Sequence, residues 1–380
     1  MSIKLFFSGD VVIKENPGNE LFHSSLHDII SNCDVACCNF EAPITTQRQV
    51  KSKKIGPHLS QSQATFDALV NVGFSLFALA NNHIMDFGSK GLLGTIDAIK
   101  KAGKNYIGAG SNEKEAFQAF LYEKDNIKVA IVDVAENGFG SIVNKSDTGY
   151  AWFGQECYLP KLKELCRDYD HVIVICHAGA ELWNVPLPEI RSLYKSWIDF
   201  GVTAVIAHHP HVPQGWEQYK SGMIYYSLGN FAFNKGLGIQ NPKTISVLVD
   251  ITPDGISFEN LYTEFKNGTI GICRDQKFKE YMDEVSRILN KDNYTEYIEY
   301  VDKMSINKFK ASYMGYYGSV LNYYDGSIKR FLKTFYFRYL KRERFSNTWL
   351  YHNLTIETHY WICRRALRLL EGKNNESTIR

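Results

Sequence analysis

Three histidines at the end of a short apolar run offer the clearest chemistry in the sequence. Residues 204–207 form an apolar run of strand length, and His208, His209 and His211 follow, with Pro210 between the last two. Such a run is typical of a buried parallel strand, and ligands bind beyond the carboxyl ends of these strands. In an extended backbone the rings of His209 and His211 would face the same way, as two nitrogen ligands of one metal must.

The same transition from an apolar run to polar side chains recurs along the chain. It occurs after the strand-like runs at residues 3–8, 34–38, 74–80, 171–176 and 223–228. The polar residues that follow them are Asp10, Asn39, Glu41, Asn81, Asn82, His83, Asp86, His177, Glu181 and Asn230. Each acidic residue alone could be a turn former or helix cap. Because parallel strands end at one edge of a sheet, their recurrence predicts a common site.

The donor types indicate which ligand this site would take. Carboxylate, amide and imidazole donors suit Zn, Mn or Fe better than a metal selected by thiolates. Six donors are more than one catalytic zinc needs, so we expect two divalent metal ions. The six expected metal ligands are Asp10, Glu41, Asn82, His177, His209 and His211.

Two further residues suit proton transfer, and five others suit substrate binding. His83 is the expected catalytic acid, and Asp86 either orients it through the second ring nitrogen or caps the following turn. The residues expected to contact substrate are Asn39, Asn81, Glu181, His208 and Asn230. For Asn230, which follows a glycine, a turn-forming role is the more common one.

Composition places few other limits on function. The chain has 380 residues, of which 44% are hydrophobic and 22% charged, as in an ordinary soluble enzyme. A formal net charge of +2 gives no reason to expect a nucleic-acid partner. Gly108 and Gly110 lack the third glycine of a dinucleotide fingerprint. The eight cysteines form no CxxC pair, which favours a reducing compartment. Without a signal-like or membrane-spanning apolar run, we expect a cytoplasmic location, with contact at the inner face of the membrane as an option.

The chain divides into two regions of different composition. Residues 1–270 alternate between strand-like and helix-like patterns and predict an α/β domain, whereas residues 271–380 are helical, basic and rich in aromatic side chains. Within residues 327–344 and 364–373, basic residues outnumber acidic ones. This extension would lie on an anionic membrane surface, contact an acidic polymer, or simply expose a solvated face.

Several of these motifs, taken in order, resemble those of a known family. They are Gly9-Asp10, residues 39–41 (NFE), 81–88 (NNHIMDFG), 177–181 (HAGAE), 209–212 (HPHV) and 227–231 (SLGNF). This set, spread over residues 3–265, resembles the CapA family of capsule or poly-γ-glutamate synthesis proteins, part of the calcineurin-like metallophosphatase superfamily. The resemblance implies a four-layer αββα sandwich around a dinuclear metal site.

The same resemblance implies roles for individual residues. Asp10 matches the first metallophosphatase aspartate, Asn82 and His83 the Asn-His pair, and His177 the isolated histidine ligand. His209 and His211 match the final His-x-His motif. The sequence departs from the superfamily pattern at two positions. Val12 stands where the superfamily has a histidine, and Glu41 stands where it has a bridging aspartate. Both departures are typical of the CapA branch.

The function implied is a metal-dependent hydrolase, most simply of phosphoesters. It would act in the biosynthesis or processing of capsule, exopolysaccharide or poly-γ-glutamate. The alternative is a non-hydrolytic accessory protein that binds an anionic polymer.

Overall fold

A computed structural model describes residues 2–15, 17, 21–45, 50–233, 242–290, 294–314, 317, 328–336 and 347–378. These residues form two compact units, Met1–Leu289 and Asn290–Arg380. The first unit extends beyond the boundary expected at residue 270, because helix α7 (Gln276–Ile288) packs on it. Arg191 donates a hydrogen bond to the carbonyl of Leu289, and the backbone N–H of Trp216 donates to Ser286 Oγ.

One mixed sheet of the first unit has the order β16-β15-β14-β1-β2-β3-β4, with β13 also paired to β1. Strands β1 to β4 are parallel to one another, whereas β14, β15 and β16 run antiparallel. Its strands are β1 (Ile3–Val12), β2 (Val35–Phe40), β3 (Leu76–Ala78), β4 (Asn105–Ile107), β13 (Asn230–Phe233), β14 (Lys243–Thr252), β15 (Gly255–Lys266) and β16 (Thr269–Ile272).

The second sheet has the order β11-β12-β10-β9-β7-β6, with parallel strands at its centre and antiparallel strands at both edges. Its strands are β6 (Phe120–Lys124), β7 (Ile127–Ala135), β9 (His171–His177), β10 (Ala204–His208), β11 (Trp216–Tyr219) and β12 (Gly222–Tyr225). A small third sheet pairs β5 (Ala109–Gly110) with β8 (Gly149–Tyr150). Strands β2 and β10 are buried at every position, as continuous apolar runs predict for strands covered on both faces.

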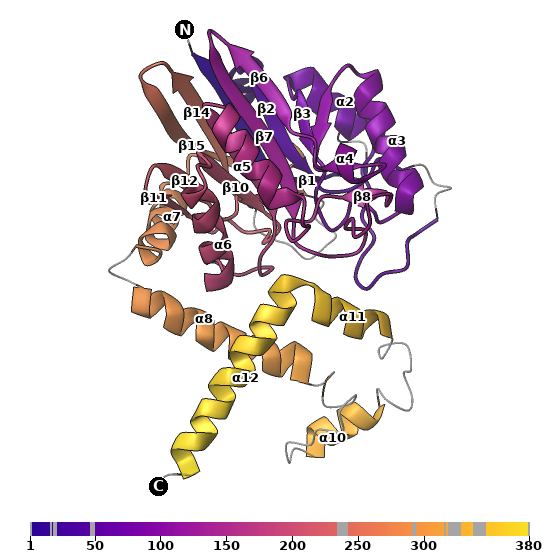
Figure 1. Ribbon diagram of the computed structural model, residues 1–380, viewed down its shortest axis with the longest axis vertical. Helices are drawn as coiled ribbons and strands as arrows, with labels where there is room; N and C mark the ends of the chain where they lie inside the picture. The colour runs from indigo at the N-terminus through magenta and orange to yellow at the C-terminus, as the bar shows by residue number, and fades with distance from the viewer. Residues whose placement is uncertain are drawn as a thin grey trace. The chain divides into compact units, whose positions relative to one another are not determined.

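Helices cover the outer faces of the two large sheets (Figure 1). Helices α5 and α6 lie against the second sheet, and α1 and α3 contact the first. This arrangement confirms the predicted αββα sandwich. Besides α7, the helices of this unit are α1 (Ser24–Ser31), α2 (Gln63–Val72), α3 (Gly88–Lys101), α4 (Glu113–Ala116), α5 (Tyr158–Asp168) and α6 (Pro188–Asp199).

The described part of the second unit is helical. Its helices are α8 (Tyr294–Lys308), the π-helix η3 (Phe309–Tyr313), α10 (Ile328–Phe335), α11 (Asn347–Thr355) and α12 (Glu357–Thr378). Helices α8 and α12 pack together, with an ion pair of 2.8 Å between Arg365 and Asp302. Residue 327 and residues 337–344 of the predicted basic stretch lie outside the described residues. Among the helices that are described, none combines the length and apolarity needed to cross a bilayer.

A bulge in β1 sets the position of Asp10. The sequence predicts that this strand ends at Ser8, but β1 continues to Val12 with register shifts on both sides of Asp10. Gly9 permits the close approach of β13, because a Cβ atom at this position would lie 1.9 Å from the carbonyl oxygen of Gly229. A bulge changes the direction of a strand's side chains, so Asp10 is presented within the strand rather than after it.

Candidate metal centre

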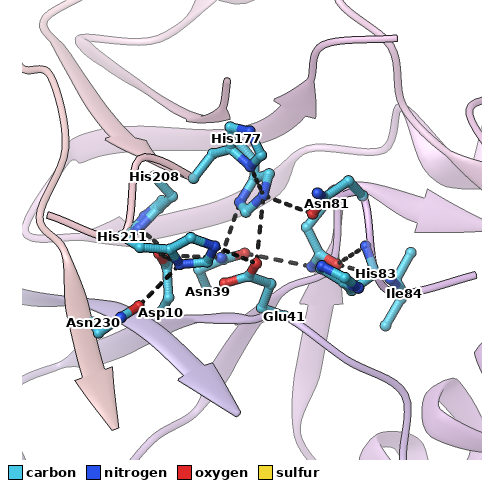
Figure 2. A network of polar contacts seen from close by, with 12 residues as sticks. Asp10, Asn39, Glu41, Asn81, His83, Ile84, His177, His208, His211 and Asn230 are labelled. Carbon is cyan, nitrogen blue, oxygen red and sulfur yellow. Dashed lines mark hydrogen bonds and ion pairs between the residues drawn. The ribbon is translucent and has the colours of Figure 1, made fainter. Parts of the chain in front are cut away.

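Side chains from both sheets meet where the central strands end (Figure 2). Asp10 comes from β1, Glu41 directly follows β2, and His177 is the last residue of β9. Each offers a ligand atom, and these three atoms lie within 4.8 Å of one another. The sequence therefore predicted correctly that these three distant residues meet.

Glu41 lies at the middle of the cluster. Its side chain is fully buried, and no described residue donates a hydrogen bond to either carboxylate oxygen. Its Oε1 atom lies 3.8 Å from His177 Nε2 and 3.7 Å from His211 Nε2. Burial, together with the charges of Asp10 and Glu181, raises the pKa of Glu41 well above its ordinary value. A carboxylate in this position has unused acceptor capacity that a cation would satisfy.

Asp10 is surrounded by donors. Asn39 Nδ2 donates to Asp10 Oδ1 at 2.7 Å, His208 Nδ1 lies 3.3 Å from the same oxygen, and His211 Nδ1 lies 3.4 Å from Oδ2. Burial opposes ionisation of Asp10, but the two nearby histidines outweigh it and hold its pKa well below its ordinary value. Burial also opposes protonation of His211, yet Glu41 and Asp10 raise its pKa to about 10. An ionised Asp10 thus lies beside a protonated His211 in the metal-free protein.

His177 and His209 form a second group of donors. His177 Nε2 lies 3.0 Å from Asn82 Oδ1 and 3.0 Å from His209 Nδ1, while its Nδ1 atom lies 3.1 Å from Asn39 Nδ2. Burial lowers the pKa of His177 well below its ordinary value and that of His209 to about 4. Both rings are therefore neutral at physiological pH, which is the form that binds metals.

The backbone that carries His209 and His211 differs from the prediction. Strand β10 ends at His208, and His209 and His211 have φ angles of 96° and 61°. The expectation of an extended backbone was therefore wrong. A left-handed turn, rather than strand alternation, brings the two rings to a centroid separation of 6.0 Å. Such strain is found where the surrounding structure holds functional side chains in place.

His83 lies beside this centre and is oriented by Asp86. Its Nδ1 atom lies 2.7 Å from Asp86 Oδ2, which also accepts a hydrogen bond of 2.6 Å from the backbone N–H of Leu59. Of the two roles left open for Asp86, orientation of His83 is thus seen directly. Burial lowers the pKa of His83 despite this carboxylate.

Two charged residues near the centre were missed by sequence reasoning. Lys54 forms a buried ion pair with Asp86, and its Nζ atom lies 3.1 Å from His83 Nδ1. Nothing in the sequence separates it from the neighbouring Lys51 and Lys53. Glu136 Oε1 lies 3.5 Å from His209 Nε2, and it follows β7 in the same strand-to-acid pattern that identified the other residues.

Four of the five residues expected to contact substrate instead contact other groups of the protein. Asn39 and His208 contact Asp10, and Asn230 Oδ1 lies 3.0 Å from His211 Nδ1. Asn81 accepts hydrogen bonds from the backbone N–H groups of residues 83 and 84 and donates to the carbonyl of residue 40, so its amide supports the turn. All four side chains are buried, which leaves Glu181 as the exposed member of the set.

Comparison with known proteins identifies relatives of the first unit. The chain is 33% identical over 227 residues to "Capsule biosynthesis protein CapA" of Bacillus anthracis, covering 58% of this chain and 55% of that protein. It is 30% identical over 241 residues to "PGA biosynthesis protein CapA" of Bacillus subtilis strain 168, covering 60% and 63%. A "Probable polyglutamine synthesis accessory protein" of Mycobacterium tuberculosis is 27% identical over 212 residues, covering 52% of this chain and 55% of that protein. The chain thus spans between about half and two thirds of these relatives' length.

Solved structures resemble the chain only in part. A hypothetical protein from Thermus thermophilus matches 70% of this chain and 100% of its own, with a TM-score of 0.45 and 15% identity. A putative 5'-nucleotidase from Staphylococcus aureus matches 75% of this chain and 58% of its own, with a TM-score of 0.45 and 13% identity. At these scores the likeness says nothing about activity.

The family itself follows from the sequence profile. The profile described as "Bacterial capsule synthesis protein PGA_cap" matches residues 4–235, which is more than half of the chain and includes all the expected ligands. The family predicted from the ordered motifs is thereby confirmed, and the chain belongs to the bacterial capsule synthesis protein PGA_cap family.

Proposed function

We propose that this protein is a metal-dependent hydrolase, acting on a phosphoester during the synthesis or processing of a bacterial surface polymer. The observation that carries the proposal is the buried cluster of Asp10, Glu41 and His177, whose ligand atoms lie within 4.8 Å of one another. Burying a carboxylate without donors, as at Glu41, is costly unless a cation compensates it.

The donor set fits divalent metal ions. Glu41 has two buried oxygens without a hydrogen bond from any described residue, and His177 and His209 are neutral imidazoles. Oxygen and nitrogen donors of this kind suit Mn, Zn or Fe. The proposed ligands are Asp10, Glu41, Asn82, His177, His209 and His211.

The contacts among these donors favour two ions rather than one. His211 lies close to Asp10 and Glu41, whereas His177 lies close to Asn82, His209 and Glu41. Glu41 Oε1 is nearly equidistant from His177 and His211, at 3.8 and 3.7 Å. Glu41 would therefore hold metal together with both groups of donors.

The protein's own residues would perform the remaining chemistry. Divalent ions at this site would polarise a phosphoryl oxygen and make a water molecule more acidic. His83, held through Nδ1 by Asp86, has its Nε2 atom left for the leaving oxygen of the substrate. A bound phosphoester favours the imidazolium form of His83, which then protonates that oxygen.

The biological setting is inferred from relatives. Two of them are named as capsule or PGA biosynthesis proteins and one as a probable accessory protein of polyglutamine synthesis. We propose that the substrate of this chain belongs to the same class of pathway, as a phosphoester or an anionic polymer.

Elemental analysis combined with an activity assay tests the proposal. The purified chain should bind two equivalents of metal and hydrolyse an aryl phosphodiester when manganese is added. His209→Ala should lose metal and turnover, because it removes a neutral imidazole from the centre. His27→Ala is the matched control, since His27 is exposed on α1, and it should retain both.

Two results would contradict the proposal. Turnover retained by His209→Ala would exclude this centre as the site of hydrolysis. Little bound metal and no turnover with any divalent ion would favour the alternative, a non-hydrolytic accessory protein that binds an anionic polymer.

A further inference from the structure

Helix α10 exposes an apolar face to solvent. Ile328, Phe331, Leu332 and Phe335 have exposed fractions of 72%, 54%, 59% and 49%. Their spacing of three, four and seven residues places them on one side of a helix. With Tyr336, this stretch of nine residues holds five of the eighteen large hydrophobic side chains that are exposed in the described part of the chain. Apolar side chains gathered in this way mark a surface that binds something.

The same segment concentrates positive charge. Residues 328–344 contain seven lysines and arginines and a single glutamate, and three of the seven, Lys329, Arg330 and Lys333, lie within α10 itself. The formal net charge of the whole chain is only +2, so the rest of the protein is net acidic. The positive charge is thus a local property of this segment, and it selects an anionic partner.

The combination of an apolar face with basic residues favours a lipid surface over other anionic partners. A polymer such as polyglutamate is fully hydrated and would gain nothing from four exposed apolar side chains. A second copy of this segment would bring like charges together. An anionic bilayer satisfies both features, because it buries the apolar face and attracts lysine and arginine to its headgroups.

We propose that α10 binds in the plane of an anionic lipid bilayer. Ile328, Phe331, Leu332 and Phe335 enter the boundary between headgroups and acyl chains, and the positive charge of the segment attracts the helix to the anionic headgroups. The helix lies on the bilayer rather than crossing it, because its eight residues are far fewer than the ~20 that a membrane-spanning helix needs. This binding does not depend on the proposed hydrolysis.

Vesicle flotation of the full chain tests this proposal. The probes are phosphatidylcholine vesicles with and without phosphatidylglycerol. The protein should float with the anionic vesicles and much less with neutral ones, and added salt should weaken binding because it screens the basic residues. The double variant Phe331→Ser, Leu332→Ser keeps every charge, and its partition onto anionic vesicles should fall by roughly tenfold or more.

A matched control separates this face from exposed hydrophobic residues in general. Leu121 and Val143 are 52% and 54% exposed in the first unit, so Leu121→Ser, Val143→Ser removes comparable surface and should leave binding unchanged. Circular dichroism checks that both double variants fold.

Three outcomes would overturn the proposal. The first is wild-type protein that does not float with anionic vesicles. The second is purely electrostatic recognition, which would be seen as full vesicle binding by the Phe331, Leu332 variant or as binding to soluble poly-γ-glutamate alone. The third is a wild-type dimer that becomes monomeric in this variant without lipid, which would make the face an interface between two copies.

Discussion

Lys54 and Asp86 form an ion pair in which both side chains are almost completely removed from solvent, with exposed fractions of 3% and 0%. The pair joins the segment before α2 to the turn that carries His83. The backbone N–H groups of Ser52 and Leu59 also donate to Asp86, so this aspartate organises the segment around itself. Through Asp86, Lys54 also supports the position of the His83 ring.

Replacing Lys54 should therefore destabilise the protein. Lys54→Met leaves the Asp86 carboxylate buried without its cation, and breaking such a pair costs about 3 kcal/mol or more in the free energy of unfolding. Denaturant unfolding measures the change. Lys53→Met is the matched control, because Lys53 is exposed and its replacement should change stability by less than about 0.5 kcal/mol. Equal stability of the two variants would show that the ion pair is not formed in solution.

Removing the charge of Glu41 should separate stability from metal binding. Burial raises the pKa of Glu41 well above its ordinary value, which favours the neutral side chain that Glu41→Gln imitates. We expect the metal-free variant to melt at the same temperature as the wild type or higher. The rise in Tm with manganese should be much smaller, because a proposed metal ligand has lost its charge.

Thermal unfolding with and without manganese measures both effects. Glu123→Gln, at an exposed position of β6, should show the full metal-dependent rise. An undiminished rise in Glu41→Gln would exclude Glu41 as a ligand.

The buried carboxyl group of Asp133 should make stability depend on pH. Asp133 on β7 accepts a hydrogen bond of 2.7 Å from the backbone N–H of Ala80 in the facing layer, and burial raises its pKa well above its ordinary value of 3.8. The folded state therefore keeps a proton that the unfolded chain has already lost. Its contribution is complete below about pH 3.8 and declines as the pH rises toward the elevated pKa.

Asp133→Asn removes this proton but keeps an oxygen for the Ala80 N–H. Relative to the variant, the wild type should lose stability with rising pH, by up to about 1.4 kcal/mol per pH unit. Urea unfolding at several pH values between 4 and 8 gives the comparison, with Asp254→Asn in an exposed turn as the control. A constant difference between wild type and Asp133→Asn across this range would contradict a raised pKa.

The sequence by itself determined an α/β fold and the meeting of Asp10, Glu41 and His177, while the sandwich followed from the resemblance of its ordered motifs to a known family. Apolar runs of strand length can be buried only at the centre of a covered sheet, and parallel strands present their carboxyl ends at one edge. Asp10, Glu41 and His177 were identifiable for this reason although they are far apart along the chain. The role of the basic extension stays a prediction, because part of it lies outside the described residues.

Only the tertiary structure decided which neighbours these side chains meet. Lys54 was indistinguishable from Lys53 in the sequence, because its burial depends on how a loop packs against Asp86. The left-handed turn at His209 and the bulge at Asp10 are local conformations that strand periodicity does not predict. Periodicity reports which face a side chain occupies within its own element, whereas distances between elements are set by packing. The buried cluster of Asp10, Glu41 and His177 is a product of that packing.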